Sequence, residues 1–135
     1  MSTRRPWRAG ALVLCIAWPA ADAAPDVARG EQIYARCQAC HALAYDRVGP
    51  RHCGLFGRVA GSVAQFGYSP AMRNSRIVWN DKSLDVFLAH PLKTVPGTTM
   101  TYAGIPDANE RADLIAFLKH ANGTVECANT RAAKP

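Results

Sequence analysis

Two cysteines and a histidine stand close together in the N-terminal third of the chain, as Cys37-Gln38-Ala39-Cys40-His41. Thiols form thioether bonds when they add to vinyl groups, and an imidazole nitrogen is a common ligand for iron. Two cysteines separated by two residues and followed at once by a histidine are typical of covalent c-type haem attachment. The spacing therefore predicts one haem bound through Cys37 and Cys40, with His41 as an axial ligand of its iron.

Two other kinds of site use a Cys-x-x-Cys pair. A redox-active dithiol of the thioredoxin kind would follow a strand in a βαβ pattern, and the sequence shows no such pattern. A structural zinc site would need a second close pair of ligands. The remaining cysteines after the motif, Cys53 and Cys127, are far apart. The sequence favours haem attachment over both alternatives.

A methionine is a suitable second axial ligand for an electron-transferring haem. Met100 ends the segment Pro96-Gly97-Thr98-Thr99-Met100, and a turn followed by polar residues is an unusual place to bury a thioether for packing alone. Met72 has the same chemistry, and its alternative role is that of a core residue. Three histidines are further candidate ligands, which we interpret as surface residues: His52, His90 and His120.

Apolar spacing and capping residues predict three main helices. The first begins after Asp26 and runs to about Arg36, and the second covers Asp81 to Ala89. The third covers Asp107 to His120, with Asp107 and Glu110 in the positions of a capping box. No segment has the pattern of a robust strand. Residues 42–76 are rich in Gly, Pro and polar residues, so we expect a long loop that wraps around the haem.

The first 24 residues have the pattern of a signal peptide. Three arginines precede a short apolar run, and small residues follow at Ala23 and Ala24, after either of which cleavage is expected. An uncleaved anchor is the alternative. The prediction is a signal peptide over residues 1–24 and one domain over residues 25–135, exported to the periplasm.

Cysteine usage and charge fit that compartment. Cys15 leaves with the signal peptide, and the even pair Cys53 and Cys127 is predicted to form a disulfide in an oxidising environment, with two free thiols as the alternative. The full chain has 16 Lys+Arg, 10 Asp+Glu and a net charge of +6, and cleavage after Ala24 would leave +4. This excess is too small to indicate nucleic-acid binding, but it is compatible with a basic face for an acidic redox partner.

From about Gly30 to Ala121 the chain resembles the class I cytochromes c of the mitochondrial and purple-bacterial type. The motifs that carry the resemblance occur in the order typical of that family. They are Gly30 with Tyr34, the Cys37–His41 motif, Val48-Gly49-Pro50, Gly54-Leu55-Phe56-Gly57-Arg58, Trp79, Pro96-Gly97-Thr98-Thr99-Met100, and Arg111-Ala112-Asp113-Leu114-Ile115-Ala116-Phe117-Leu118.

The resemblance implies an all-α cytochrome c fold, in which three main helices and long loops enclose one covalent haem with Met100 as the second axial ligand. It implies that the Pro50 carbonyl accepts a hydrogen bond from His41. Other residues are implied to hold the haem propionates: Arg58, Tyr68 and Trp79 for the inner one, and Thr98 for the other.

The implied function is electron transfer by a monomeric periplasmic carrier that is not an enzyme. A cytochrome bc-type membrane complex is the expected donor, and an oxidase, a photosynthetic reaction centre or a reductase is the expected acceptor. The alternatives are a haem enzyme or gas sensor with a labile sixth ligand, and a structural haem subunit. Phe87 and Met72 depart from the family pattern, which often has Tyr and Asn there. Several lysines of the family's docking face are also absent, which leaves Arg36 and Lys93.

Overall fold

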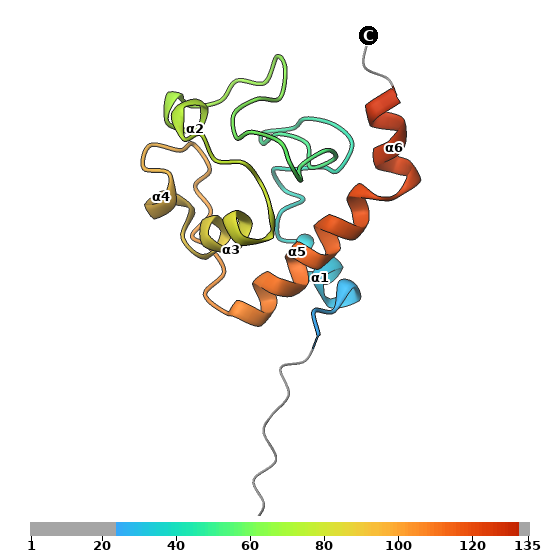
Figure 1. The fold of residues 1–135 in the computed structure, drawn as a ribbon. Coiled ribbons are helices and arrows are strands. Elements are labelled where there is room, and N and C mark those ends of the chain that lie inside the picture. The colour runs from blue at the N-terminus through green and yellow to red at the C-terminus, as the bar shows by residue number, and fades with distance from the viewer. Residues whose placement is uncertain (1–23, 133–135) are drawn as a thin grey trace, which may run out of the picture.

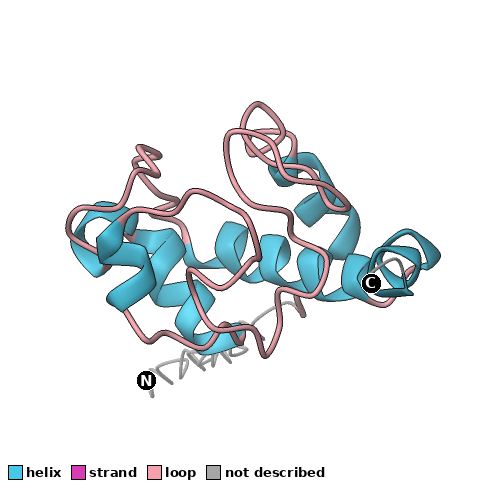
Figure 2. Cartoon of the chain, turned by 90° about the horizontal axis from the view of Figure 1, so that it is seen from above, coloured by secondary structure: helices cyan, strands magenta, loops and turns pink. Residues whose placement is uncertain are grey.

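The computed structural model describes residues 24–132, which form helices joined by long loops (Figures 1 and 2). Within that range there are no strands, and an isolated bridge joins Val59 to Val78. The prediction of an all-α fold is therefore confirmed. Residues 1–23 of the predicted signal peptide lie outside the described residues. The helices are α1 (Val27–Tyr34), α2 (Pro70–Asn74), α3 (Asp81–Ala89), α4 (Pro91–Thr94), α5 (Ala108–Asn122) and α6 (Val125–Ala132).

Helix α1 begins at the predicted cap and leads directly into the cysteine motif. The Asp26 carboxylate accepts hydrogen bonds from the amides of Ala28 and Arg29, which are free at a helix start. After Tyr34 the chain continues in tight turns, in which the His41 amide donates to the Cys37 carbonyl at 2.9 Å. The motif is therefore held by main-chain hydrogen bonds at the end of a helix.

Helices α1 and α5 cross in close contact. A Cβ atom added to Gly30 would lie 2.0 Å from the Asp113 carbonyl oxygen, so only glycine permits this approach of the two backbones. Tyr34 and Phe117 pack beside the crossing, with ring centroids 5.1 Å apart. Because the cysteine motif follows directly after α1, this crossing fixes where the motif lies relative to α5 (Figure 1).

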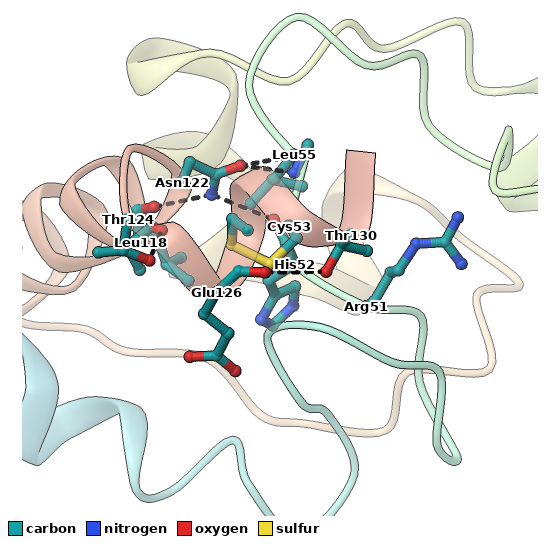
Figure 3. Close-up of a disulfide and its surroundings, with 12 residues drawn as sticks. Arg51, His52, Cys53, Leu55, Leu118, Asn122, Thr124, Glu126 and Thr130 are labelled. Atoms are coloured by element: carbon teal, nitrogen blue, oxygen red, sulfur yellow. Dashed lines mark hydrogen bonds between the residues drawn. A yellow bond between two sulfur atoms is a disulfide. The ribbon is translucent and has the colours of Figure 1, made fainter. Parts of the chain in front are cut away.

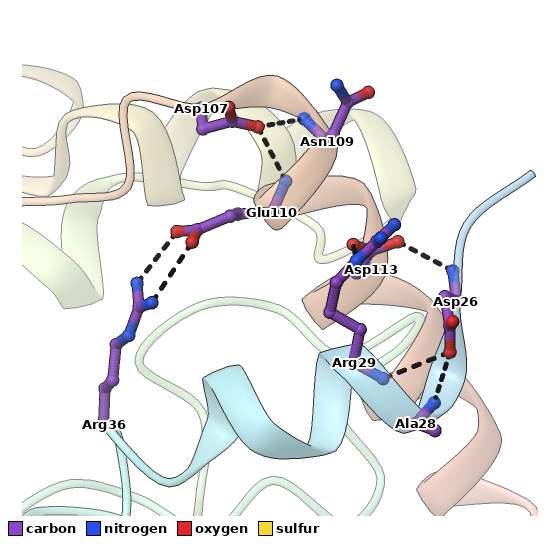
Figure 4. A network of polar contacts seen from close by, with 8 residues as sticks. All are labelled: Asp26, Ala28, Arg29, Arg36, Asp107, Asn109, Glu110 and Asp113. Carbon is purple, nitrogen blue, oxygen red and sulfur yellow. Dashed lines mark hydrogen bonds and ion pairs between the residues drawn. The ribbon is translucent and has the colours of Figure 1, made fainter. Parts of the chain in front are cut away.

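A buried carboxylate fastens the same crossing (Figure 4). Asp113 is 1% exposed and accepts hydrogen bonds from the Asp26 amide, at 2.7 Å, and from the Arg29 guanidinium. The hydrogen bond from Arg29 holds the pKa of Asp113 below its usual range. The carboxylate is therefore charged at neutral pH. A second ion pair, between Arg36 and Glu110, joins the segment after α1 to α5.

One capping prediction is wrong in part. Asp107 caps α5, as its carboxylate accepts from the amides of Asn109 and Glu110 at 2.8 and 2.9 Å. The Glu110 side chain, which a capping box would direct back to the cap, instead binds the Arg36 guanidinium at 2.8 and 3.2 Å. Glu110 thus forms an ion pair with Arg36, which follows α1, in place of the reciprocal hydrogen bond of a capping box.

Three short or terminal helices were not predicted. Helix α2 interrupts the long loop expected over residues 42–76, and Ser69 caps it. Pro91 does not only end α3, because it also occupies the first turn of α4, where a missing amide hydrogen costs nothing. Helix α6 follows α5 after a short turn and lies at the far side of the molecule from α2, α3 and α4 (Figure 1). No helix within residues 24–132 combines the length and hydropathy needed to cross a bilayer.

Candidate functional site

A pocket between α1, α3, α5 and the long loops is lined by the residues that the sequence predicts to bind a cofactor. Buried apolar side chains such as Leu84 and Leu114 form much of its wall. All the site residues that the sequence predicts lie in its lining: Cys37, Cys40, His41, Pro50, Arg58, Tyr68, Trp79, Thr98 and Met100. Segments that are far apart in the sequence are therefore brought to one cavity.

His41 is held in one orientation at this pocket. Its Nδ1 donates to the Pro50 carbonyl oxygen at 2.7 Å, so Nε2 is left with the lone pair that a metal ligand needs. Burial lowers the pKa of His41, although the hydrogen bond to Pro50 opposes the shift. A Cβ on Gly49 would lie 2.3 Å from Cε1 of the ring, so the backbone packs directly against the imidazole. The ring is neutral and fixed at one edge.

The four cysteines within residues 24–132 fall into two chemically different pairs. Cys37 and Cys40 are free thiols at the pocket, half-buried and exposed respectively. Cys53 and Cys127 form a disulfide, with Cα atoms 5.0 Å apart (Figure 3). Within residues 24–132, the pair beside His41 is thus the one available for thioether bonds.

Met100 lies in the pocket lining at the end of its turn. Thr98 is 8% exposed, and its hydroxyl accepts a hydrogen bond from the Met100 amide at 3.2 Å. Met72 also lines the pocket, but it is 8% exposed within α2 and belongs to the apolar core. Phe87 is buried and packs on Trp79, with ring centroids 5.0 Å apart. The loop position of Met100 leaves its thioether in the pocket without a helix to hold it.

Arg58 places a positive charge beside the pocket. Its guanidinium donates to the carbonyl oxygens of Arg51 and Cys53 at 2.9 and 3.2 Å. None of the ion pairs within residues 24–132 includes Arg58, and burial lowers the pKa of its guanidinium. Tyr68 and Trp79 line the same pocket. A half-buried cation beside two hydrogen-bond donors is suited to an anionic group such as a carboxylate.

One residue of the pocket was predicted wrongly. His52 was interpreted as a surface residue, but it lines the pocket, and its ring stacks on His41 with centroids 4.4 Å apart and an interplanar angle of 19°. Burial holds the pKa of His52 well below its ordinary value. His90 and His120 are exposed, as expected. Tyr34, which bonds to His52, was noted in the sequence only as part of a family motif with Gly30.

The residues present fit a haem. An apolar pocket contains two free thiols next to an oriented histidine, a methionine from a separate loop, and an arginine suited to a propionate. The sequence profile of the cytochrome c family matches residues 27–122. The chain belongs to the cytochrome c family. Members of this family carry a covalently attached c-type haem and transfer electrons, so the chain is an electron-transfer protein and not an enzyme.

Individual relatives agree with this assignment. The chain is 41% identical over 103 residues to a cytochrome c2 of Blastochloris viridis, an alignment that covers 74% of this chain and 81% of the relative. It is 48% identical over 96 residues to a cytochrome c of Tetrahymena pyriformis, covering 70% and 87%. Cytochrome cH from Methylobacterium extorquens is a similar solved structure, with a TM-score of 0.68, 40% identity, and coverage of 70% of this chain and 98% of that one. The expected cytochrome c fold is thus confirmed.

Proposed function

We propose that the chain binds a single haem through Cys37 and Cys40, with His41 and Met100 as axial ligands, and carries electrons one at a time in the periplasm. The observation that supports this most is the presence of both free thiols, the oriented His41 and Met100 in the lining of one pocket. The bound haem supplies reversible one-electron exchange at its iron. Two protein ligands would leave no coordination position for a substrate.

The other pocket residues would hold the cofactor and its ligands in place. The Pro50 carbonyl fixes the His41 tautomer and makes the imidazole a better donor. Arg58, Tyr68 and Trp79 would bind the inner propionate, which would compensate the arginine charge. Thr98 accepts a hydrogen bond from the Met100 amide, and it would also bind the other propionate. In this arrangement the protein keeps the ligands constant between the two oxidation states.

Two features of the chain support the proposed periplasmic location. Residues 1–24 would act as a signal peptide that is removed, and residues 25–135 would form the mature domain. The disulfide between Cys53 and Cys127 is of the kind that persists in oxidising compartments such as the periplasm. A monomeric carrier there would take electrons from a cytochrome bc-type complex. It would pass them to an oxidase, a reaction centre or a reductase.

The absorption spectrum tests the proposed function. The purified oxidised protein should be low-spin, should show the charge-transfer band of an iron–thioether bond, and should keep its pigment through acidified organic extraction. These results follow from two axial ligands and two thioether bonds. A high-spin spectrum with ready carbon monoxide binding would instead favour a haem enzyme or gas sensor. A colourless protein would contradict haem attachment altogether.

The pocket rim bears on how a partner would dock. The exposed residues in the pocket lining include one charged side chain, Arg36, and the Glu110 carboxylate binds it through two hydrogen bonds. The other exposed lining residues are neutral: Cys40, Val48, Thr99 and Thr101. Val48 is 81% exposed. The exposed lining is therefore nearly neutral, which suits a partner surface that carries little charge at this place.

Electron transfer should accordingly depend weakly on salt. The Debye length falls from about 30 Å at 0.01 M to about 10 Å at 0.1 M ionic strength, which suppresses steering between charged surfaces. We expect the second-order rate constant with the physiological oxidase or bc-type complex to change by less than about threefold over that range, whereas steered pairs change by about tenfold or more. Stopped-flow kinetics would measure it. Thr99→Lys should introduce a salt dependence, and a tenfold fall in the wild type would contradict a neutral rim.

A further inference from the structure

A second histidine lies against the proposed axial ligand, and the proposed haem ligation gives it no role. We propose that His52, held by the Tyr34 hydroxyl, is a positioning residue that sets the orientation of the His41 ring, an inference that rests on the proposed ligation of a haem by His41. The two imidazole rings stack with centroids 4.4 Å apart and planes inclined by 19°. Stacked rings at this distance restrict each other's rotation.

The hydrogen bond to Pro50 alone does not fix the His41 plane. It holds Nδ1 at 2.7 Å from the carbonyl oxygen, but a ring can turn about such a bond with little loss. Contacts with the ring faces remove that freedom. Gly49 and His52 both pack against the imidazole, so its plane is set by these neighbours.

Tyr34 fixes the His52 ring in turn. The Tyr34 hydroxyl lies 3.1 Å from His52 Nδ1, and the two rings meet edge to face with centroids 5.6 Å apart. Tyr34 is 2% exposed and packs on Phe117 of α5. The Tyr34 hydroxyl and His52 Nδ1 thus satisfy each other's hydrogen-bonding requirement. The crossing of α1 and α5 determines where the hydroxyl lies.

The backbone of His52 is held independently of its ring (Figure 3). Its carbonyl accepts from the Asn122 side chain at 3.1 Å, and its amide donates to the carbonyls of Ala42 and Leu43, each at 3.1 Å. The next residue, Cys53, is joined to α6 by the disulfide. His52 therefore presents its ring to His41 from a fixed support.

Packing alone does not explain this pair. A leucine or phenylalanine would fill a comparable volume with no polar atom to satisfy, whereas a histidine needs a partner at the correct distance and angle. Tyr34 supplies that partner from helix α1. The directional hydrogen bond thus transmits the rigid geometry of the helix crossing to the ring that would ligate the iron.

Proton NMR of the oxidised holoprotein tests the inference, because the order of the haem-methyl resonances depends on the orientation of the axial ligands, and His52 stacks on the proposed axial ligand His41. Tyr34→Phe, which removes only the hydroxyl, and His52→Leu should each change that order. Ile115→Val in α5 is the matched control: Ile115 is a buried core residue that is not part of the pocket lining, so its substitution should lower stability and leave the order unchanged.

The outcomes separate this inference from the proposed function. If Tyr34→Phe retains the wild-type order, as the Ile115→Val control should, the positioning role is overturned. Should His52→Leu fail to mature, Tyr34→Phe decides alone, because phenylalanine retains the packing of the ring. A wild-type protein without the iron–thioether band would contradict the proposed ligation itself, whereas a normal band with unchanged variants would contradict only the role of His52.

Discussion

Replacing Met100 by leucine should abolish the iron–thioether charge-transfer band and lower the reduction potential by on the order of 0.1 V or more. Axial ligands set haem potentials over a range of about 0.8 V, and a methionine sulfur favours the ferrous state. Leucine has nearly the volume of methionine but cannot coordinate iron. The Thr98 hydroxyl bonds to the Met100 amide, so the turn should keep its shape in the variant. Absorption spectroscopy and potentiometric titration measure both effects.

Met72→Leu is the control matched to this prediction. Met72 lies in the same pocket lining, but it is a buried residue of α2 in the apolar core. Its replacement should retain the band and reduce stability by less than about 1.5 kcal/mol, as volume-conserving core substitutions do. The opposite pattern, in which the band is lost from Met72→Leu and kept in Met100→Leu, would reverse the assignment of the ligand.

The sequence predicted the helices that position the site because they carry strong local signals. Asp26 and Asp107 cap α1 and α5 as expected, and the apolar residues Leu114 and Phe117 recur at helical spacing. Helix α3 has the predicted bounds. The candidate site residues were recognisable because they occur in short motifs along the chain, and in the structure these residues line one pocket.

The remaining elements depend on contacts that the local sequence does not encode. Helices α2 and α4 are too short to show an apolar period, and each starts at a proline that sequence reasoning interprets as a break. Helix α6 has as many polar as apolar residues and contains Cys127, which is 0% exposed. Its position follows from the disulfide and from the turn after α5, which are tertiary features.

The position of His52 could not be predicted from the sequence for a related reason. A single polar residue in a loop is usually exposed, and nothing near it in the sequence indicates burial. Its partner, Tyr34, lies 18 residues earlier on α1. Arg36 was expected to remain available for docking, but the structure pairs it with Glu110 on α5. Pairing across elements was the information missing in both cases.

Removing the disulfide by Cys53→Ala with Cys127→Ala should lower the free energy of unfolding by about 4 kcal/mol, which corresponds to a fall in Tm of about 15 °C or more. The bond closes a loop with a sequence separation of 74 and so restricts the conformations of the unfolded chain. Without the bond, the unfolded chain has more conformational entropy and is therefore more stable relative to the folded state. Alanine avoids placing new polar atoms at two buried positions. Guanidinium unfolding of the oxidised holoprotein measures the change.

The chain-entropy explanation also predicts what the double variant should keep. The loop of residues 52–55 is still held by Asn122. The side chain of Asn122 accepts hydrogen bonds from the amides of Gly54 and Leu55 and donates one to the carbonyl of His52. The iron–thioether band of the folded variant should therefore be unchanged while its stability falls. Asn129→Ala, at an exposed position of α6, should alter stability by no more than about 0.5 kcal/mol. A loss below about 1 kcal/mol in the double variant, or a loss of the band, would contradict an effect that acts through the unfolded chain.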